Sequence, residues 1–468
     1  MRAQESAAKF LILLVLFWSF PQPSFAYSFL THENLVDVVW KGSIRPALLA
    51  RFPTATPEQL REARAYVYGG ATIQDMGYYP FGHQFFSNLT HYVRPGDFVN
   101  NLFRDAQTVD EYAFAIGALA HYVGDNDGHR YATNPSTPIE FPSLEKKFGP
   151  VVTYDESPRG HVRTEFAYDV EQLSQHRFAP AGYLRSVGFR VPRRLLEQAF
   201  YDTYGLRLRS ILGRPFPAIE SYRSSDEHFL QMIARADVLI YRKSFPPELD
   251  TLAFHQFAVR QAQAEKENGW DRFSRKPGFK VHLLAIILRI LPKIGPISDV
   301  AIRGPSPETN RWYIESFNRS VDDYEQLLAK QRKHPRASLN LPDRDLDTGY
   351  LVRPGGYRLT DQTYAELLNK LTAEPDRRIP TGLQQNILAY YSDPNAPIAT
   401  KKNPKAWKRV QADLIVLRGM QTHGPRPFDM ADFRNGRPTV VYRLCDAGSD
   451  CESATPRSID DTSSHHQQ

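Results

Sequence analysis

The stretch that decides the fold, HYVGDNDGH, begins at His121, reaches Asp125 four residues later and ends four residues after that at His129. A second stretch repeats the same interval, because His161 precedes Glu165 by four residues. Residues four apart share one face of an α-helix, so each stretch predicts a helix that presents an imidazole beside a carboxylate. Two such helices facing each other would enclose nitrogen and oxygen donors of the kind that Zn²⁺ binds at ~2.0–2.2 Å.

The apolar setting of the first stretch favours a metal. The residues before His121 are mainly Ala, Phe and Gly, so a helix there would bury the carboxylate of Asp125. A buried carboxylate is costly unless a cation or hydrogen bonds meet it, and a core pair satisfied by hydrogen bonds is the alternative. His129 falls in a glycine-containing turn after this helix, and we expect it to fold back as a further ligand.

Other candidate donors lie near the N-terminus. His32 follows shortly after Tyr27, the first residue expected in the mature chain, and Asp75 follows a predicted helix. A freed α-amino group and the carbonyl oxygen of Tyr27 could join His32 and Asp75 at another metal.

Two histidines, His83 and His91, lie between Asp75 and His121. The sequence Asn-Leu-Thr precedes His91 and is a polar lead-in suited to the start of a helix. We therefore favour His91 as a ligand, with His83 as the alternative.

Helix signals dominate the mature chain. Residues 56–59, TPEQ, form a capping box with a proline at the first helical position, and that helix is expected to end near Gly70. Residues 108–111 repeat the capping box before a helix for which Gly124 and Gly128 are stop signals. Further helical patterns cover 191–212, 225–243, 249–268, 311–332 and 360–372, and short strand-like runs cover 350–352 and 439–442.

The chain begins with the features of an export signal. Basic residues precede an apolar run over residues 10–20, and prolines break this run before Ser24-Phe25-Ala26. This ending fits the small-x-small cleavage rule. We expect removal of residues 1–26 and a mature protein in the periplasm or outside the cell.

The C-terminal end carries the two cysteines of the chain, Cys445 and Cys451. Outside the cytosol they could form a small local disulfide loop. From residue 447 to residue 468 apolar periodicity is absent, which predicts a disordered tail.

Length and charge set wider bounds. The chain has 468 residues and a formal net charge of +6, and without a clustered basic stripe this charge is weak evidence for lipid or nucleic acid partners. The apolar run 281–290 is shorter than the ~20 residues that span a bilayer. We expect a buried core helix there, with an interfacial membrane contact as the alternative.

Pro-rich linkers after residue 270 divide a helical domain over 27–270 from a mainly helical region over 271–446.

The ordered set of candidate ligands resembles the bacterial zinc-dependent phospholipase C family, which shares an all-helical fold with fungal-type zinc nucleases. The resemblance rests on His121-Tyr122-x2-Asp125, on Gly160-His161-x3-Glu165, and on the acidic and histidine residues that precede them. It covers about residues 27–180. It implies an all-α, multi-helix bundle, followed by a mainly helical C-terminal extension of unknown fold.

The resemblance also implies the metal ligands. Two or three zinc ions per chain would be held by His91, His121 and Asp125; by His129, His161 and Glu165; and by Tyr27, His32 and Asp75. Asp75 is further implied to accept a proton from the attacking water. The chain departs from the family in that Tyr27 stands where a tryptophan is usual, and in that the interval from Asp125 to His129 is shorter.

The function expected from these features is phosphodiester hydrolysis by an exported zinc enzyme, a phospholipase C acting on glycerophospholipids at a membrane surface. A single-strand nuclease on the same scaffold is one alternative. It would need aromatic side chains for base stacking, and Tyr78, Tyr79, Phe81, Phe85 and Phe86 are available. An exported protein with structural zinc and a partner-binding C-terminal half is the other alternative.

Overall fold

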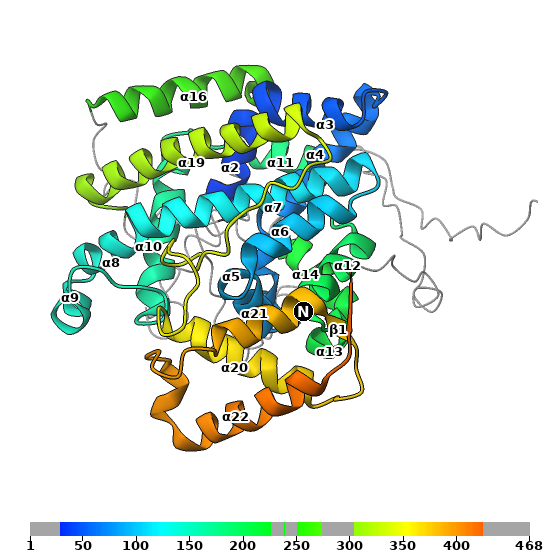
Figure 1. Cartoon of the computed structure of the whole chain (residues 1–468). Helices are drawn as coiled ribbons and strands as arrows, with labels where there is room; N and C mark the ends of the chain where they lie inside the picture. The colour runs from blue at the N-terminus through cyan, green and yellow to red at the C-terminus, as the bar shows by residue number, and fades with distance from the viewer. Residues whose placement is uncertain (1–28, 226–237, 239–249, 274–303, 425–468) are drawn as a thin grey trace, which may run out of the picture. The chain divides into compact units, whose positions relative to one another are not determined.

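The structure is a computed structural model that describes residues 29–225, 250–273 and 304–424, together with residue 238 (Figure 1). The described residues all fall within one compact unit, Met1–Arg426. They are mostly helical, which confirms the predicted all-α class.

The α-helices that follow one another closely in the first half are α2 Phe29–Val39, α3 Arg45–Arg51, α4 Pro57–Ala71, α5 Gln84–Tyr92, α6 Pro95–Asp105, α7 Val109–Gly128, α8 Asn134–Glu140, α9 Pro142–Phe148, α10 Pro158–Ser174, α11 Ala181–Val187, α12 Arg193–Tyr204, α13 Leu208–Leu212 and α14 Pro215–Ser224. The later helices are α16 Leu252–Asn268, α19 Pro307–Lys333, α20 Arg358–Thr372, α21 Thr381–Tyr390 and α22 Pro404–Gly419. Short π or 3₁₀ turns are η1 Trp40–Ile44, η2 Ile73–Tyr78, η3 His129–Thr133, η5 Trp270–Phe273 and η6 Ala399–Lys402.

Helices α4 and α7 cross in close contact through glycines. A Cβ atom on Gly117 would lie 2.0 Å from the carbonyl oxygen of Val67, and one on Gly70 would lie 2.1 Å from that of Phe114. Only a residue without a side chain allows this approach. The crossing holds the C-terminal end of α4 against the middle of α7, one turn before His121.

The predicted ends of these two helices lie close to the observed ones, except that Gly124 does not stop α7. Helix α4 continues through Gly70 to Ala71, and α7 continues through Gly124 to Gly128 before η3 extends it. Packing of the helices outweighs the intrinsic preference of glycine for a helix end. The predicted capping box of α4 is present in full, because Thr56 accepts a hydrogen bond from the Gln59 amide and the Gln59 side chain accepts one from the Thr56 amide.

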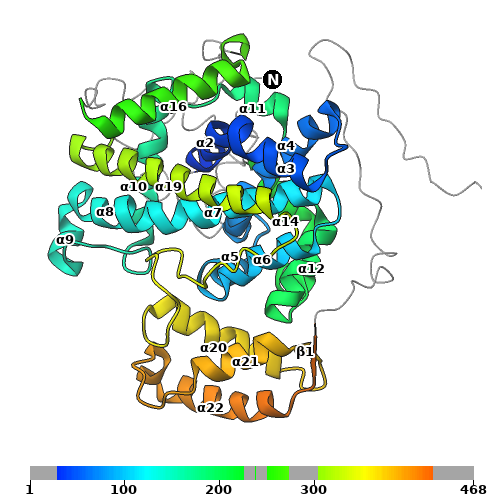
Figure 2. The same ribbon diagram turned by 45° about the horizontal axis from the view of Figure 1, so that its top comes forward.

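Helix α19 packs against α7 although it lies far along the chain. Figures 1 and 2 show α16, α19 and α7 side by side. Tyr313, Phe317 and Tyr324 of α19 are buried, and the Tyr324 hydroxyl donates a hydrogen bond to the carbonyl oxygen of Ile116 in α7 at 2.9 Å. The division of the chain at residue 270 stays a prediction, but α19 adds a layer to the helices of the first half.

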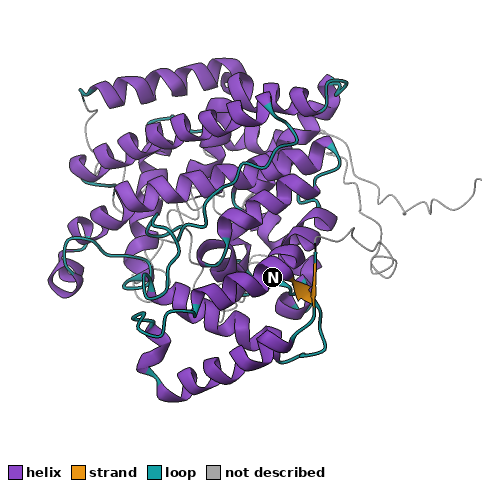
Figure 3. Cartoon of the chain, viewed as in Figure 1, coloured by secondary structure: helices purple, strands orange, loops and turns teal. Residues whose placement is uncertain are grey.

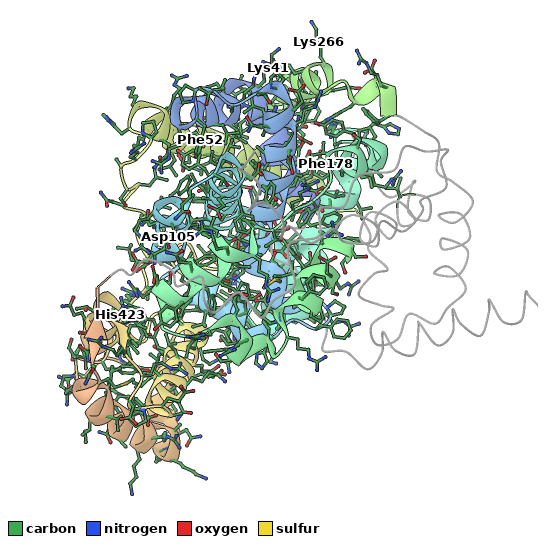
Figure 4. All side chains as sticks on the ribbon, turned by 90° about the vertical axis from the view of Figure 1, so that its right-hand side faces the viewer. Lys41, Phe52, Asp105, Phe178, Lys266 and His423 are labelled. Carbon is green, nitrogen blue, oxygen red and sulfur yellow. The ribbon has the colours of Figure 1, made fainter. Side chains whose placement is uncertain are left out.

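Helices α20, α21 and α22 form the C-terminal part of the described unit. The Tyr364 and Tyr390 rings of α20 and α21 stack at 3.8 Å between centroids. Strands β1 Ile379–Pro380 and β2 Thr422–His423 pair in parallel (Figure 3). Figure 4 shows His423 beside these helices and Lys41 at the opposite end of the view, where Lys41 pairs with Glu267 at 3.6 Å.

Residues 334–357 join α19 to α20, and we refer to them as the connecting segment. Figures 1 and 2 show its path across α6 and α7. The Pro342 carbonyl oxygen accepts a hydrogen bond from the Tyr122 hydroxyl of α7 at 2.6 Å, and Asp343 accepts one from the Asp97 amide of α6 at 3.0 Å. The connecting segment is therefore fixed to the two helices beneath it.

Three of the later helix predictions are confirmed by α16, α19 and α20. The helix predicted over 191–212 is interrupted at Gly205, which has a φ of 64°, so it forms α12 and α13. Leu351 makes an isolated bridge with Arg344 and no longer strand.

Other predictions lie outside the described residues. These are the export signal, Tyr27, most of the helix over 225–243, the apolar run 281–290, the strand over 439–442, the cysteine pair and the tail. Among the helices that the structure describes, none combines the length and the apolar character required to cross a membrane.

Candidate metal centre

The ligand-bearing end of α7 continues without a break into η3. His121, Asp125 and His129 therefore follow one another along a single helical face, and His129 does not lie in the turn that the sequence predicted. Nε2 of His121 lies 3.1 Å from Oδ2 of Asp125, and Nε2 of His129 lies 3.8 Å from Oδ1. The carboxylate of Asp125 stands between two imidazoles of its own helix.

Backbone carbonyls orient two of the imidazoles. Nδ1 of His121 lies 3.0 Å from the Ala71 carbonyl oxygen at the end of α4, and Nδ1 of His91 lies 2.7 Å from that of Ser87. A carbonyl oxygen only accepts hydrogen bonds, so each Nδ1 carries a proton, and each Nε2 is the ring nitrogen left to coordinate a metal. The glycine-mediated crossing of α4 and α7 thus sets the donor atom of His121.

The predicted first set of donors is brought together. Nε2 of His91 and Nε2 of His121 lie 3.3 Å apart, and Oδ2 of Asp125 lies 3.3 Å and 3.1 Å from them. Two donors at roughly 2.1 Å from one tetrahedral ion are about 3.4 Å apart. The three atoms therefore have the spacing of one face of a zinc site.

Asp75 and His32 each contact a member of this first set. Oδ1 of Asp75, in η2, lies 3.3 Å from Nε2 of His91. Nε2 of His32, in α2, lies 3.3 Å from Oδ1 of Asp125, and the His32 ring stacks on His121 with centroids 4.3 Å apart. His32 thus lies against Asp125, and Asp75 against His91, whereas the sequence placed His32 and Asp75 at one ion.

The start of α2 is anchored by a buried carboxylate from α10. Asp169 accepts hydrogen bonds from the amides of Leu30 at 3.0 Å and Thr31 at 3.1 Å, and from the Thr31 hydroxyl at 2.7 Å. An acidic side chain on the first amides of a helix is a favourable cap. This cap fixes the residue before His32 and so fixes the direction of its side chain.

The second set of donors joins η3 to α10. Oε1 of Glu165 lies 3.0 Å from Nε2 of His129 and 2.8 Å from Nε2 of His161. Helix α10 starts where Ser157 caps the amide of Gly160 at 3.2 Å, so the imidazole and the carboxylate at 161 and 165 share its inner face. The grouping predicted from the sequence is present.

The donor set fits a cation. Three groups each have their donor atoms within 4.8 Å of one another, and the first two share His121: Asp75, His91 and His121; His32, His121 and Asp125; and His129, His161 and Glu165. All of these residues are at most 3 % exposed. Both oxygens of Asp125 and Nε2 of His161 are buried without a hydrogen bond of standard geometry in the described part of the protein, so their lone pairs are available to an ion.

Charge within the cluster supports the same conclusion. Burial lowers the pKa of His161. Burial also opposes protonation of His91, but two hydrogen-bonded carboxylates outweigh it and raise the pKa to about 10. Burial opposes ionisation of Asp125, yet the imidazoles of His121 and His129 hold its pKa well below the usual range. An ionised carboxylate among imidazoles is the donor state that a divalent cation requires, and metal binding displaces imidazole protons.

The alternative ligand His83 lies elsewhere. It caps α5, because its Nδ1 accepts a hydrogen bond from the Phe85 amide at 3.2 Å. The structure therefore distinguishes His91, which faces the cluster, from His83, which does not.

The sequence did not indicate the residues that contact the second set from outside. Leu346 and Asp347, in the connecting segment, lie against the outer edges of His129 and His161. The available signal was the run DRDLDTG at residues 343–349, in which three aspartates alternate within a stretch without helical periodicity. Such a run outside a helix resembles a solvated turn unless its burial is known.

A comparison with known families bears on the region that supplies all the candidate donors described above. Residues 31–213 match the family model of zinc dependent phospholipase C. This confirms the family resemblance for that part of the chain. None of the curated proteins or solved structures matches the chain. The connecting segment lies beyond the residues that this phospholipase C family model matches.

Proposed function

We propose that this protein is an exported zinc-dependent phosphodiesterase that hydrolyses glycerophospholipids as a phospholipase C. The observation that carries the proposal is the convergence of buried imidazoles and carboxylates from α2, η2, α5, α7, η3 and α10, within the region that matches the phospholipase C family. The number of ions, the export of the chain and the lipid substrate all belong to the proposal.

The residues of the chain have distinct roles in this proposal. Bound zinc would supply Lewis acidity toward phosphoryl oxygens and lower the pKa of water. His91, His121 and Asp125 hold one position, and His129, His161 and Glu165 hold another. Asp75, with Oδ1 3.3 Å from Nε2 of His91, lies at the edge of the first position and is the proposed proton acceptor for the attacking water.

The five candidate stacking residues count against single-stranded nucleic acid as the substrate. Base stacking requires exposed rings. Of the five candidates, Tyr78, Tyr79, Phe85 and Phe86 are buried, and Phe81 is 62 % exposed. One exposed ring is a poor platform for successive bases.

The test uses purified chain from residue 27 onward with phosphatidylcholine vesicles and, in parallel, a labelled single-stranded oligonucleotide. We expect release of phosphocholine, its loss on chelation and its return with Zn²⁺. The His121→Ala/His161→Ala double variant should be inactive, and His255→Ala, at an exposed histidine, is the matched control. Vesicle hydrolysis by the double variant at the control rate would exclude this site, and cleavage of the oligonucleotide alone would establish the nuclease.

Export has its own test. The chain expressed with residues 1–26 in a bacterial host should be recovered outside the cytosol with Tyr27 as its N-terminal residue. A cytosolic product that retains Met1 would overturn the export proposal and leave the assay above unaffected.

A further inference from the structure

The connecting segment reaches the second donor set from the side opposite to Glu165. Nδ1 of His129 lies 2.9 Å from the Leu346 carbonyl oxygen, which accepts its hydrogen bond. Oδ1 of Asp347 lies 3.8 Å from Nδ1 of His129 and 3.8 Å from Nδ1 of His161. Glu165 approaches both imidazoles at Nε2, so Asp347 is on the outer edge of the rings and not among the donors.

Asp347 is held rigidly in this place. Its Oδ2 accepts hydrogen bonds from the Tyr154 amide at 3.0 Å and from the Tyr357 hydroxyl. Its backbone amide donates to Oδ1 of Asp345 at 3.0 Å, and its carbonyl oxygen accepts from the Asn134 side chain at 2.7 Å. With these contacts the carboxylate cannot turn away from the histidines.

The other carboxylate oxygen of Asp347, Oδ1, faces His161. Oδ1 of Asp347 and Nδ1 of His161 are both buried, and neither has a hydrogen bond in the described part of the protein. Buried polar atoms left without a partner are costly. Their separation of 3.8 Å exceeds a hydrogen bond by less than 1 Å, a gap that a small rotation of the His161 ring closes.

We propose that Asp347 is a positioning residue for the second metal position, the outer carboxylate that fixes the rings of His161 and His129 and strengthens them as zinc donors. Histidine ligands commonly donate their second N–H to a carboxylate or a backbone carbonyl, which fixes the tautomer and raises the basicity of the coordinating nitrogen. Here Leu346 supplies the carbonyl oxygen for His129, and Asp347 supplies the carboxylate for His161. Both come from outside residues 31–213.

This inference rests on the zinc-binding part of the proposed function and not on the lipid substrate. The chosen substitution is Asp347→Asn. The amide keeps an oxygen that accepts from Tyr154 and Tyr357, but it places an N–H donor opposite the N–H of His161. The volume is unchanged, while the acceptor and the negative charge are lost.

The experiment measures zinc affinity. Wild type, Asp347→Asn and Asp347→Glu are loaded with Zn²⁺, and zinc per chain is measured against a graded series of chelators, with the Co²⁺ absorption spectrum as a second readout. We expect Asp347→Asn to weaken one metal position by ~10–100-fold and to leave the other unchanged, with partial recovery in Asp347→Glu. The control is Asp343→Asn, four residues earlier, which should match wild type.

Three results would overturn the inference. The first is a zinc affinity of Asp347→Asn equal to that of wild type, and the second is an equal loss of zinc affinity at every metal position. The third is loss of helical structure in both Asp347 variants. Absence of zinc from the wild-type chain would overturn it together with the zinc part of the proposed function. Zinc binding with the expected defect, but without hydrolysis of vesicles, would reject the lipid substrate and support the role of Asp347.

Discussion

The two donor sets of the candidate centre are built from different parts of the chain. The first, His91 with His121 and Asp125, is oriented by Ala71 and Ser87, which lie in the same stretch of helices as the ligands. The second, around His129 and His161, is contacted from the connecting segment. The imidazole rings of the first set are therefore oriented by residues of the family region, whereas those of the second set are contacted by residues from outside it. The connecting segment reaches the first set only through the backbone, where the Leu346 amide donates a hydrogen bond to the His91 carbonyl oxygen at 3.1 Å.

Substitution of Asp125 tests whether the two donor sets are independent of each other. We expect it to have the largest effect on hydrolysis and zinc content. Its Oδ2 faces His91 and His121, and its Oδ1 faces His32 and His129. Loss even of an outer partner of a metal ligand costs ~10–100-fold in metal affinity or activity, and Asp125 faces the imidazoles of both sets directly. Asp125→Asn should therefore reduce hydrolysis by more than ~10²-fold and reduce bound zinc by more than one ion per chain. Loss of a single ion, with the remainder bound as in wild type, would show that Asp125 serves one set only.

His161 tests the independence of the second set. His161→Ala removes one of the two imidazoles facing Glu165, and we expect loss of one zinc ion, with the first set still loaded. Hydrolysis should fall by roughly 10²-fold. The measurement is the zinc content per chain after dialysis, with the His255→Ala variant as the control. Loss of every ion from a folded variant would contradict the division into two sets.

Substitution of Gly117 tests whether zinc binding by the first set depends on the crossing of α4 and α7. Gly117→Ala introduces a methyl group 2.0 Å from the Val67 carbonyl oxygen, and overpacking of this kind costs about 1–3 kcal/mol. Urea unfolding should show this loss, and zinc affinity should weaken at the first set before the second. Gly42→Ala, where a Cβ meets nothing within 4 Å, is the control. Unchanged stability in Gly117→Ala would mean that α4 can shift without cost.

Substitution of Asp343 should have the smallest effect on the metal centre. It tests the stability of the connecting segment separately from the role of that segment at the metal. Burial and the neighbouring Asp97 raise the pKa of Asp343 to about 7. Between about pH 4 and pH 7 the folded chain holds a proton that the unfolded chain has lost, so stability falls as pH rises through this window. Asp343→Asn removes this pH-dependent contribution. Urea unfolding at pH 5 and pH 8 measures it, and an equal pH 5 to pH 8 difference in wild type and variant would contradict the assignment.

Most of the centre could be predicted from the sequence because its ligands are local. The four-residue interval that joins His121 to Asp125 and His161 to Glu165 is set by the helix itself. The extension of α7 through Gly124 could not be predicted in the same way, because it depends on tertiary packing. That extension is also why His129 belongs to the helical face and not to a turn.

Asp347 could not be predicted because its contacts span long intervals of sequence. No local pattern connects it to Tyr154 or His161, and only the folded connecting segment brings them together. The layer formed by α19 has the same origin, since burial of Tyr324 against Ile116 follows from tertiary packing. Periodicity within one element predicts the element, but it does not identify the surface on which that element packs.

The contact between His129 and Leu346 has a consequence for biosynthesis. The two residues are separated by 217 positions, so at ~5–20 residues per second the carbonyl oxygen is made roughly 10–40 s after the imidazole. A nascent or truncated polypeptide therefore carries the His129 and His161 ligands before it carries the groups that orient them. In the proposed scheme, the second set is complete only after the connecting segment has been synthesised.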